Sequence, residues 1–454
     1  MTFEPIAAIE HRNAGAAIRR QAVPAAFAFL SEQFLGIVDT IAIGALGTAA
    51  LAGITAASSA FLVFGIGIYA FGSGLRILGA QAIGGGRSDR FGTIVRSSAL
   101  VPFALAIGLA LVMTIAALPV MHAMLPAGAP LDAAARYLVL RFWCLLPIVF
   151  SNQLIVAATT AGDTKLGLRV LLAINAVHVP LLLVLALGFG THHPFGLAGA
   201  GTSSLVAECI GLAYAISETA RKPALRIFSS WHVDPELVRA TASLSWPDFV
   251  FLALQILPDP VTVALLAPRG VAFVAAYRAL VVVNDLTWGL PGPLGDAVEV
   301  IVGQRIGARD YAGANAFRRE AMRINMTVCT GAAVVVAILA WPLAALCTLN
   351  PALATIAALP LAAHVLFTLP LKGYAMTTIA PIRASGDTRW VMAMGIVTTA
   401  IAIAGIALAA LAFHAGLWAF PFGWTLAWIF RVIATTLKVR TGDWERRRLA
   451  AMGG

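Results

Sequence analysis

The apolar stretch from Val23 to Gly47 is long enough to cross a bilayer, yet it contains two carboxylates, Glu32 and Asp39. About 20 consecutive apolar residues span the hydrocarbon core as an α-helix. A carboxylate inside such a helix costs a few kcal/mol and usually faces a bundle interior or a wet cavity. A straight helix places Glu32 and Asp39 on one face, about 10 Å apart along its axis. The stretch therefore predicts a membrane helix with a polar inner face.

Eleven further stretches of similar length and hydropathy follow along the 454 residues. Only 11% of the chain is charged, whereas a soluble protein keeps roughly a quarter of its residues charged. The sequence thus predicts an all-α integral membrane protein with twelve transmembrane helices. The expected spans are 22–46, 52–80, 93–120, 133–160, 166–189, 197–217, 242–267, 272–302, 322–348, 353–380, 391–413 and 417–437.

The basic residues give the chain a net charge of +10, and most of them lie in alternate loops between the apolar stretches. This placement follows the positive-inside rule rather than the pattern of a nucleic-acid-binding surface. It predicts a multi-pass protein of the plasma (inner) membrane with both termini cytoplasmic and an uncleaved first span. The four cysteines lie in apolar segments without a CxxC pair, which predicts neither a disulfide framework nor a metal site.

The second half of the chain repeats the first. The first apolar stretch returns as Trp246–Gly270, which pairs Pro24 with Pro247 and Gly47 with Gly270 at an offset of 223. AQAIGGGR returns as GQRIGAR at the same offset, and AGDT returns as SGDT at 224. Six helices per repeat predict two pseudo-symmetric six-helix bundles of parallel topology, with a substrate site near their boundary. The expected parts are an N-lobe (1–218), a cytoplasmic linker (219–241) and a C-lobe (242–454).

Several short motifs occur in order along the chain: VDT in the first span, QAIGGG, AGDT and GLAGAGTSS. Together they resemble the MATE (multidrug and toxic compound extrusion) family of transporters, and within it the DinF-type branch most closely. The resemblance implies secondary active efflux of amphiphilic, mostly cationic organic compounds. It also implies antiport with H⁺ or Na⁺ as the coupling ion, no further cofactor, and alternating access between the two lobes.

The resemblance also implies an ion-coupling site in the first half. Asp39 in VDT matches the family's coupling Asp of the first span, and Asn175 matches its fifth-span Asn. The Asp that accompanies this Asn in some members is replaced by Val179, and Ser204 stands in place of a sixth-span Thr. This departure leaves the choice between H⁺ and Na⁺ open, with a modest preference for protons.

Further polar residues in the spans have two interpretations each. Glu32 is either part of the coupling site or solvated near an interface, and His178 is either a proton relay or a helix-packing residue. Gln255 occupies the position of the seventh-span Glu of NorM-type members. Asp296 and Glu299 form either a second acidic site or a solvated patch. Lys372 is either their counter-ion or extends outward to the membrane surface. We expect Gln255, Asp296, Glu299 and Lys372 in the substrate cavity.

The intramembrane charges are predicted to favour a cationic cargo, because few bases accompany the acids. A lipid-linked precursor flippase and a non-drug metabolite exporter remain alternatives, and a membrane-bound acyl or glycosyl transferase is a third. The sequence has no Walker motif, so it predicts a transporter driven by an ion gradient. It has no visible nucleophile–base constellation, so an enzyme is not expected. We expect a monomer in the lipid bilayer that transports small molecules. The acids are Glu32, Asp39, Asp259, Asp285, Asp296 and Glu299.

Overall fold

A computed structural model describes residues 14–125, 130–190 and 195–446 of the chain. The two termini, for which the sequence predicts a cytoplasmic location, lie outside these residues. Twelve helical segments are long and apolar enough to cross a membrane, and each overlaps one of the twelve expected spans.

The elements are α1 (Ala14–Gly44), α2 (Thr48–Gly65), η3 (Ile66–Phe71), α3 (Gly72–Gly84), η4 (Ser88–Arg90), α4 (Phe91–Met124), α5 (Leu131–Thr160), α6 (Lys165–Leu185), α7 (Gly196–Ala220), η5 (Pro223–Leu225), α8 (Pro235–Gln255), α9 (Pro258–Leu266), η6 (Ala267–Arg269), α10 (Val271–Thr287), α11 (Pro291–Gly307), α12 (Tyr311–Ile338), α13 (Ala340–Thr348), α14 (Pro351–Ala384), α15 (Thr388–Leu411), η7 (Gly416–Trp418), α16 (Ala419–Arg440) and α17 (Asp443–Arg446).

The chain forms two compact units. The described residues of unit 1 are 27–83, 87–125, 130–190 and 195–249, and those of unit 2 are 14–26, 84–86 and 250–446. The first turns of α1 therefore pack with the second half of the chain, where Ile18 joins a core cluster with α11 and α12. The lobe limits expected from the sequence, 1–218 and 242–454, remain a prediction. They concern the two parts expected to move in alternating access.

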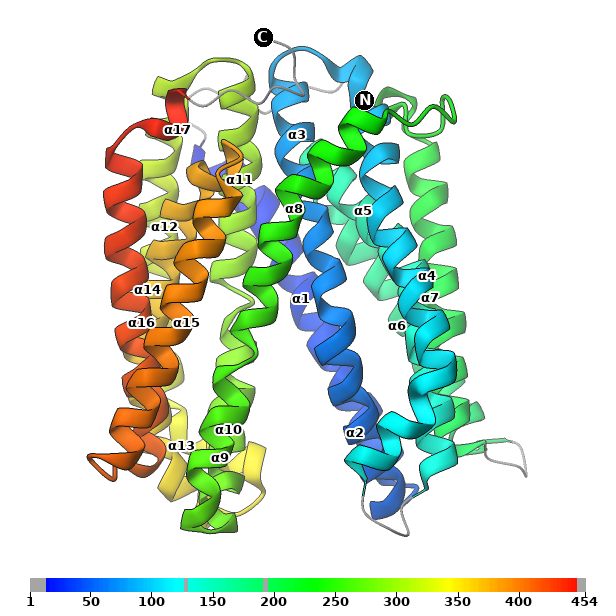
Figure 1. Cartoon of the computed structure of the whole chain (residues 1–454), viewed down its shortest axis with the longest axis vertical. Coiled ribbons are helices and arrows are strands. Elements are labelled where there is room, and N and C mark those ends of the chain that lie inside the picture. Colours follow the sequence, from blue (N-terminus) through cyan, green and yellow to red (C-terminus); the bar gives the residue numbers. More distant parts are fainter. Residues whose placement is uncertain (1–13, 126–129, 191–194, 447–454) are drawn as a thin grey trace. The chain divides into compact units, whose positions relative to one another are not determined.

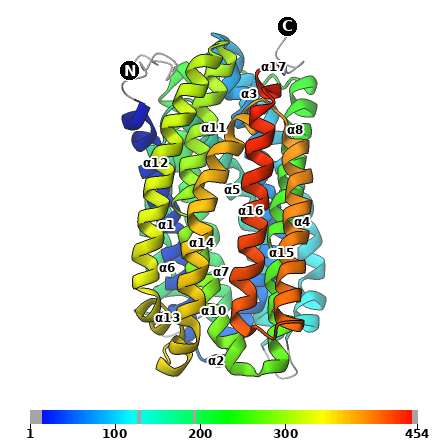
Figure 2. The ribbon, with the colours of Figure 1, turned by 90° about the vertical axis from the view of Figure 1, so that its left-hand side faces the viewer.

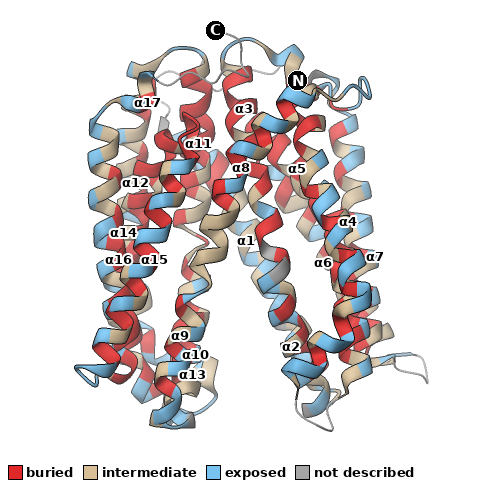
Figure 3. Cartoon of the chain, viewed as in Figure 1, coloured by how far each residue is buried: buried red, intermediate tan, exposed pale blue. Residues whose placement is uncertain are grey.

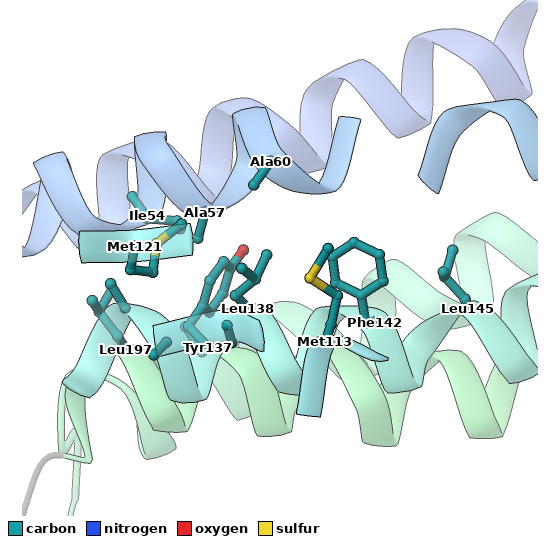
Figure 4. Packing of buried hydrophobic residues seen from close by; sticks show 14 of the residues in the cluster. Ile54, Ala57, Ala60, Met113, Met121, Tyr137, Leu138, Phe142, Leu145 and Leu197 are labelled. Carbon is teal, nitrogen blue, oxygen red and sulfur yellow. The ribbon is translucent and has the colours of Figure 1, made fainter. Parts of the chain in front are cut away.

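Unit 1 is built around α5, which packs against α2, α4 and α7. Figure 4 shows the core at this junction, where Ile54 of α2, Met121 of α4 and Tyr137 of α5 lie beside Leu197 of α7. The outer faces of the helices keep large apolar side chains, such as Ile115, which is 83% exposed. Figure 3 shows buried and exposed faces along the same helices. This pattern suits helices that bury one face in a bundle and present the other to lipid.

Unit 2 is built around α14, which packs against α10, α11, α12, α13 and α16. Figure 2 shows α14 and α16 running beside each other along the length of this unit. The core at one end contains Leu280 of α10, Leu361 of α14 and Phe420 of α16. Central helices such as α5 and α14 can hold buried polar residues because neighbouring helices surround them.

The repeat found in the sequence is visible in the backbone. Gly47 and Gly270 both end the first span of their half, and both have φ +106. This conformation favours glycine, which lacks the Cβ that would clash. The turns that end the fourth and tenth spans also match, with positive φ at Gly162 and Gly386. The two halves therefore share local backbone geometry at the predicted offsets.

The AGDT and SGDT turns use their carboxylates mainly as ion-pair partners. Asp163 accepts the Lys165 backbone N–H at 3.1 Å and also pairs with the Lys222 ammonium group. Asp387 pairs with Lys438 at 3.3 Å. In both halves the turn thus joins the end of one span to the end of the sixth span of its repeat.

Glycine and proline interrupt several spans. The second span comprises α2, η3 and α3, and the eighth breaks between α10 and α11 (Figure 1). The seventh span breaks between Gln255 and Pro258, where Pro258 and Pro260 supply no backbone N–H. The expected ninth span, 322–348, is wrong in its limits. The helix runs from Tyr311 to Ile338, since its polar first turns also fold, and α13 is a separate short helix.

Candidate functional site

A histidine–carboxylate pair joins α1 to α6 inside unit 1. His178 Nε2 lies 2.6 Å from Asp39 Oδ1, and the His178 side chain is 2% exposed. Asp39 retains some exposure, so its carboxylate lies at the edge of the packed region. A carboxylate and an imidazole at this distance share one hydrogen bond, and each is a side chain that can bind a proton. His178 therefore contacts the predicted coupling residue directly, and its role as a proton relay or as a helix-packing residue stays a prediction.

A second polar contact joins the same two helices. Asn175 Nδ2 donates to Ser31 Oγ at 2.7 Å and to the Ser31 carbonyl at 3.3 Å. Asn175 lies one turn from His178 on α6, so both side chains reach toward α1. Asn175 and His178 thus both contact α1, at Ser31 and at Asp39, which are eight residues apart. Asn175 binds the backbone of α1 and His178 binds its acid.

Ser204 lies on α7 but is used locally. Its hydroxyl donates to the Ala200 carbonyl of its own helix at 3.1 Å, and the side chain is buried. Within the described residues it makes no hydrogen bond to Asp39. The structure therefore brings Asp39 and His178 into contact, places Asn175 against Ser31 of the same helix, and leaves Ser204 hydrogen-bonded within α7.

Two charged residues that the sequence analysis did not single out complete the polar region of unit 1. Arg141 of α5 lies over the Phe61 ring, 4.7 Å from its centroid. Its charge interacts with the carboxylates of Glu32 on α1 and Glu208 on α7. Glu208 also interacts with Glu32 and His178. Glu32 is exposed. The signal in the sequence was a single Arg and a single Glu, each inside an apolar span.

Lys372 lies in the interior of unit 2 and contacts α10. It is 2% exposed, so the predicted outward path to the membrane surface is wrong, and the charge of Asp285 acts on it. Its ammonium group donates to Asn284 Oδ1 at 2.7 Å and lies 4.9 Å from the Trp288 ring centroid. Asn284 belongs to α10, which packs against α14. The other interpretation, that Lys372 is a counter-ion of Asp296 or Glu299, stays a prediction.

Asn284 is the centre of a small polar network. His364 Nε2 lies 3.0 Å from the same Asn284 Oδ1, and Asn284 Nδ2 donates to Asp285 at 3.2 Å. Asp285 also interacts electrostatically with Lys372 and Asp259. The amide oxygen of Asn284 can only accept hydrogen bonds. It accepts one from the Lys372 ammonium group, and its contact with His364 therefore requires His364 to donate through Nε2. This network holds Lys372 in the interior of unit 2.

The other predicted cavity residues lie on other helices of unit 2. Glu299 is buried in α11, and Asp296 is half-buried one turn before it. Gln255 is half-buried at the end of α8. A further base, Arg431 of α16, was also missed by the sequence analysis. It is fully buried between the rings of Trp428 and Phe251, with centroids at 4.4 and 5.1 Å. Among the described residues no group of three or more His, Cys, Asp and Glu side chains is arranged to hold a metal ion.

Comparisons with known proteins agree with this architecture. The model of the MatE family matches residues 24–184 and again residues 247–410, once in each half. The chain is 27% identical over 305 residues to the "Probable multidrug resistance protein NorM" of a Synechococcus species. That match covers 64% of this chain and 64% of the relative's length.

Solved structures share the fold at low identity. A MOP superfamily transporter from Pyrococcus furiosus, reported for the reverse polarity of its binding pocket, aligns at TM-score 0.84 and 16% identity over 97% of both chains. The Vibrio cholerae MATE transporter VcmN, in a mutant form, aligns at TM-score 0.84 and 19% identity over 96% of this chain and 99% of its own. With twelve spans, a duplicated backbone and a family model matched in both halves, the chain belongs to the MatE family of multidrug and toxic compound extrusion transporters.

Proposed function

We propose that this protein is a secondary active exporter of amphiphilic organic compounds that exchanges its cargo for protons. The observation that carries the proposal is the 2.6 Å pair between His178 and Asp39, which joins two membrane helices. An ionisable residue inside a membrane span is costly and is usually part of a transport pathway. The curated relative named as a probable multidrug resistance protein supports the same class of cargo.

The contacts of Asp39 favour protons over sodium ions as the coupling species. Hard cations prefer several oxygen ligands. The hydrogen-bond partner of Asp39 is a ring nitrogen, which itself binds protons. In the proposed cycle, protonation of the pair on one side of the membrane alternates with cargo binding. The two lobes then expose the sites to opposite sides in turn.

The charged residues in the spans do not favour a cationic cargo as strongly as the sequence predicts. The prediction of a mostly cationic cargo depended on acids without nearby bases. In the structure Arg141 accompanies Glu32 and Glu208, and Lys372 accompanies Asp285. We therefore propose amphiphilic compounds in general, with cations among them, as the cargo.

Efflux from proteoliposomes under imposed gradients tests this proposal. We expect a fluorescent amphiphilic cation to move against its gradient when only a proton gradient is applied, and not when only a sodium gradient is applied. Protein-free liposomes under the same two gradients are the control. Transport driven by sodium alone, or unaffected by either gradient, would contradict proton antiport.

A further inference from the structure

One face of α16 presents three large side chains to the interior of unit 2. Trp424, Trp428 and Arg431 are four and three residues apart, a spacing that places them on one side of a helix. Trp428 is 1% exposed and Arg431 is 2% exposed, while Trp424 is half-buried. All three carry N–H groups, so this face combines aromatic surface with hydrogen-bond donors.

Most of these donors have no acceptor within the described residues. They are the indole Nε1 of Trp424 and of Trp428, and Nε and Nη1 of Arg431. Arg431 uses its remaining nitrogen, Nη2, to donate to Thr398 at 2.9 Å. The buried Nε2 of Gln255 on α8 also has no acceptor in this part of the chain. Buried donors are normally paired because burying them without an acceptor is costly.

Basic side chains dominate the same region. Arg431 and Arg383 lie on the Phe251 ring, at 5.1 and 5.5 Å from its centroid. Lys372 is close enough to Arg431 for their charges to interact. The charge of Asp285 also acts on Lys372, and that of Arg383 acts on Arg431. Like charges held together away from water favour an anion that joins them.

The geometry points to a binding site for the acidic group of an amphiphilic organic compound, formed in unit 2 by Arg431, Lys372 and Trp428. Arg431 supplies charged donors that form short, strong bonds to a carboxylate. Trp428 and Trp288, which both lie on Lys372, supply aromatic surface for the apolar part. The site rests on the proposed function only in that its ligand is cargo, and the binding step itself requires no proton gradient.

Calorimetric titration of the purified protein in detergent tests the site with two matched probes. A naphthalene carboxylate and its neutral carboxamide share one ring system and differ in charge. We expect the wild type to bind the carboxylate at least roughly tenfold more tightly, which corresponds to about 1.4 kcal/mol. Equal affinities would overturn the site, because donors satisfied by water or a neutral group would not discriminate by charge.

Variants separate the role of Arg431 from folding. Arg431→Met should remove the preference for the carboxylate, and Arg431→Lys should retain part of it. Trp428→Phe keeps a ring and removes one donor, so it should weaken both probes by a few-fold. Arg318→Met is the matched control, since Arg318 also has an unbonded buried Nε but lies on α12 outside this region. An unchanged preference in Arg431→Met would overturn the site.

The outcomes also separate this inference from the proposed function. If proton coupling is wrong, the wild type still prefers the carboxylate but proteoliposomes show no proton-driven efflux. If the site is wrong, proton-driven efflux of cationic dyes persists while the preference for the carboxylate is absent. Should Arg431→Met fail to fold, the wild-type comparison and Arg431→Lys still decide the matter.

Discussion

The sixth span of each half begins with a glycine of nearly the same backbone conformation, yet the two spans carry opposite charges. Gly196 has φ +56 and Gly416 has φ +59, which sets their offset at 220. With this offset Glu208 of α7 corresponds to Trp428 of α16, and the position of Gly211 is taken by Arg431. The turn before each sixth span is thus alike, while the span of unit 1 carries the carboxylate of Glu208 and that of unit 2 the guanidinium of Arg431. We attribute coupling to the first and recognition of the cargo's acidic group to the second.

The first spans of the two halves differ in the same way. α1 continues unbroken through Asp39, whereas its counterpart is divided into α8 and α9. At the offset of 223 the residue equivalent to Asp39 is Thr262, whose hydroxyl donates to the Pro258 carbonyl at 2.7 Å. A carboxylate is therefore present at this position in one half only.

The largest expected effect is the loss of coupling when this acid is neutralised. Asp39→Asn should reduce proton-driven efflux at least roughly hundredfold, because the pair with His178 can no longer exchange a proton. The symmetry-related change Thr262→Val should leave efflux close to wild type. Proteoliposome transport rates, normalised to reconstituted protein, measure both. Comparable losses in the two variants would contradict the claim that coupling depends on this position in one half only.

The close packing between the fifth and sixth spans should be disturbed to a similar extent in both halves when a glycine there is replaced by alanine. A Cβ at Gly199 would lie 2.3 Å from the Leu185 carbonyl oxygen, and one at Gly423 would lie 2.5 Å from that of Ala402. Gly199→Ala and Gly423→Ala should each destabilise the protein by about 1–3 kcal/mol. Gly108→Ala, which meets nothing within 4 Å, is the control. Thermal unfolding in detergent measures the loss of stability. A clear loss in only one of the two variants would contradict equal packing in the two halves.

His178 should contribute through its proton as well as its hydrogen bond. His178→Leu removes both, and we expect efflux to fall roughly tenfold, about 1.4 kcal/mol. His178→Gln can still donate to Asp39 but cannot titrate near neutral pH, so its rate should fall nearly as far. The pH dependence of efflux, compared between the wild type and His178→Gln, distinguishes the two roles. A wild-type rate in His178→Gln would mean that the residue only positions Asp39.

The smallest effect concerns the balance of charge around Arg141. Arg141→Met leaves Glu32 and Glu208 without their shared base, and we expect a loss of about 1 kcal/mol at this partly exposed site. Arg141→Met combined with Glu208→Gln should recover most of this loss, since one repelling carboxylate is removed. Unfolding of the single and double variants forms a double-mutant cycle. Additive losses would show that the two charges do not interact.

Hydropathy and repeated motifs were sufficient to predict the twelve spans and the duplicated halves, because both are encoded locally. The same reasoning identified Asp39, since an acid in a membrane span is costly. It did not identify Glu208, Arg141 or Arg431, although each is a charged residue within an apolar span. One sequence does not reveal which helix faces meet, and for that reason the contact of Lys372 with Asn284 was not predicted.

Proton release from the purified protein on addition of cargo tests the division between the halves most directly. A pH indicator dye in weakly buffered detergent solution measures it. The wild type should release protons, Asp39→Asn should release none although it still binds cargo, and Arg431→Met should release fewer because it binds acidic cargo more weakly. Release from Asp39→Asn equal to that of the wild type would contradict the assignment of coupling to the Asp39–His178 pair.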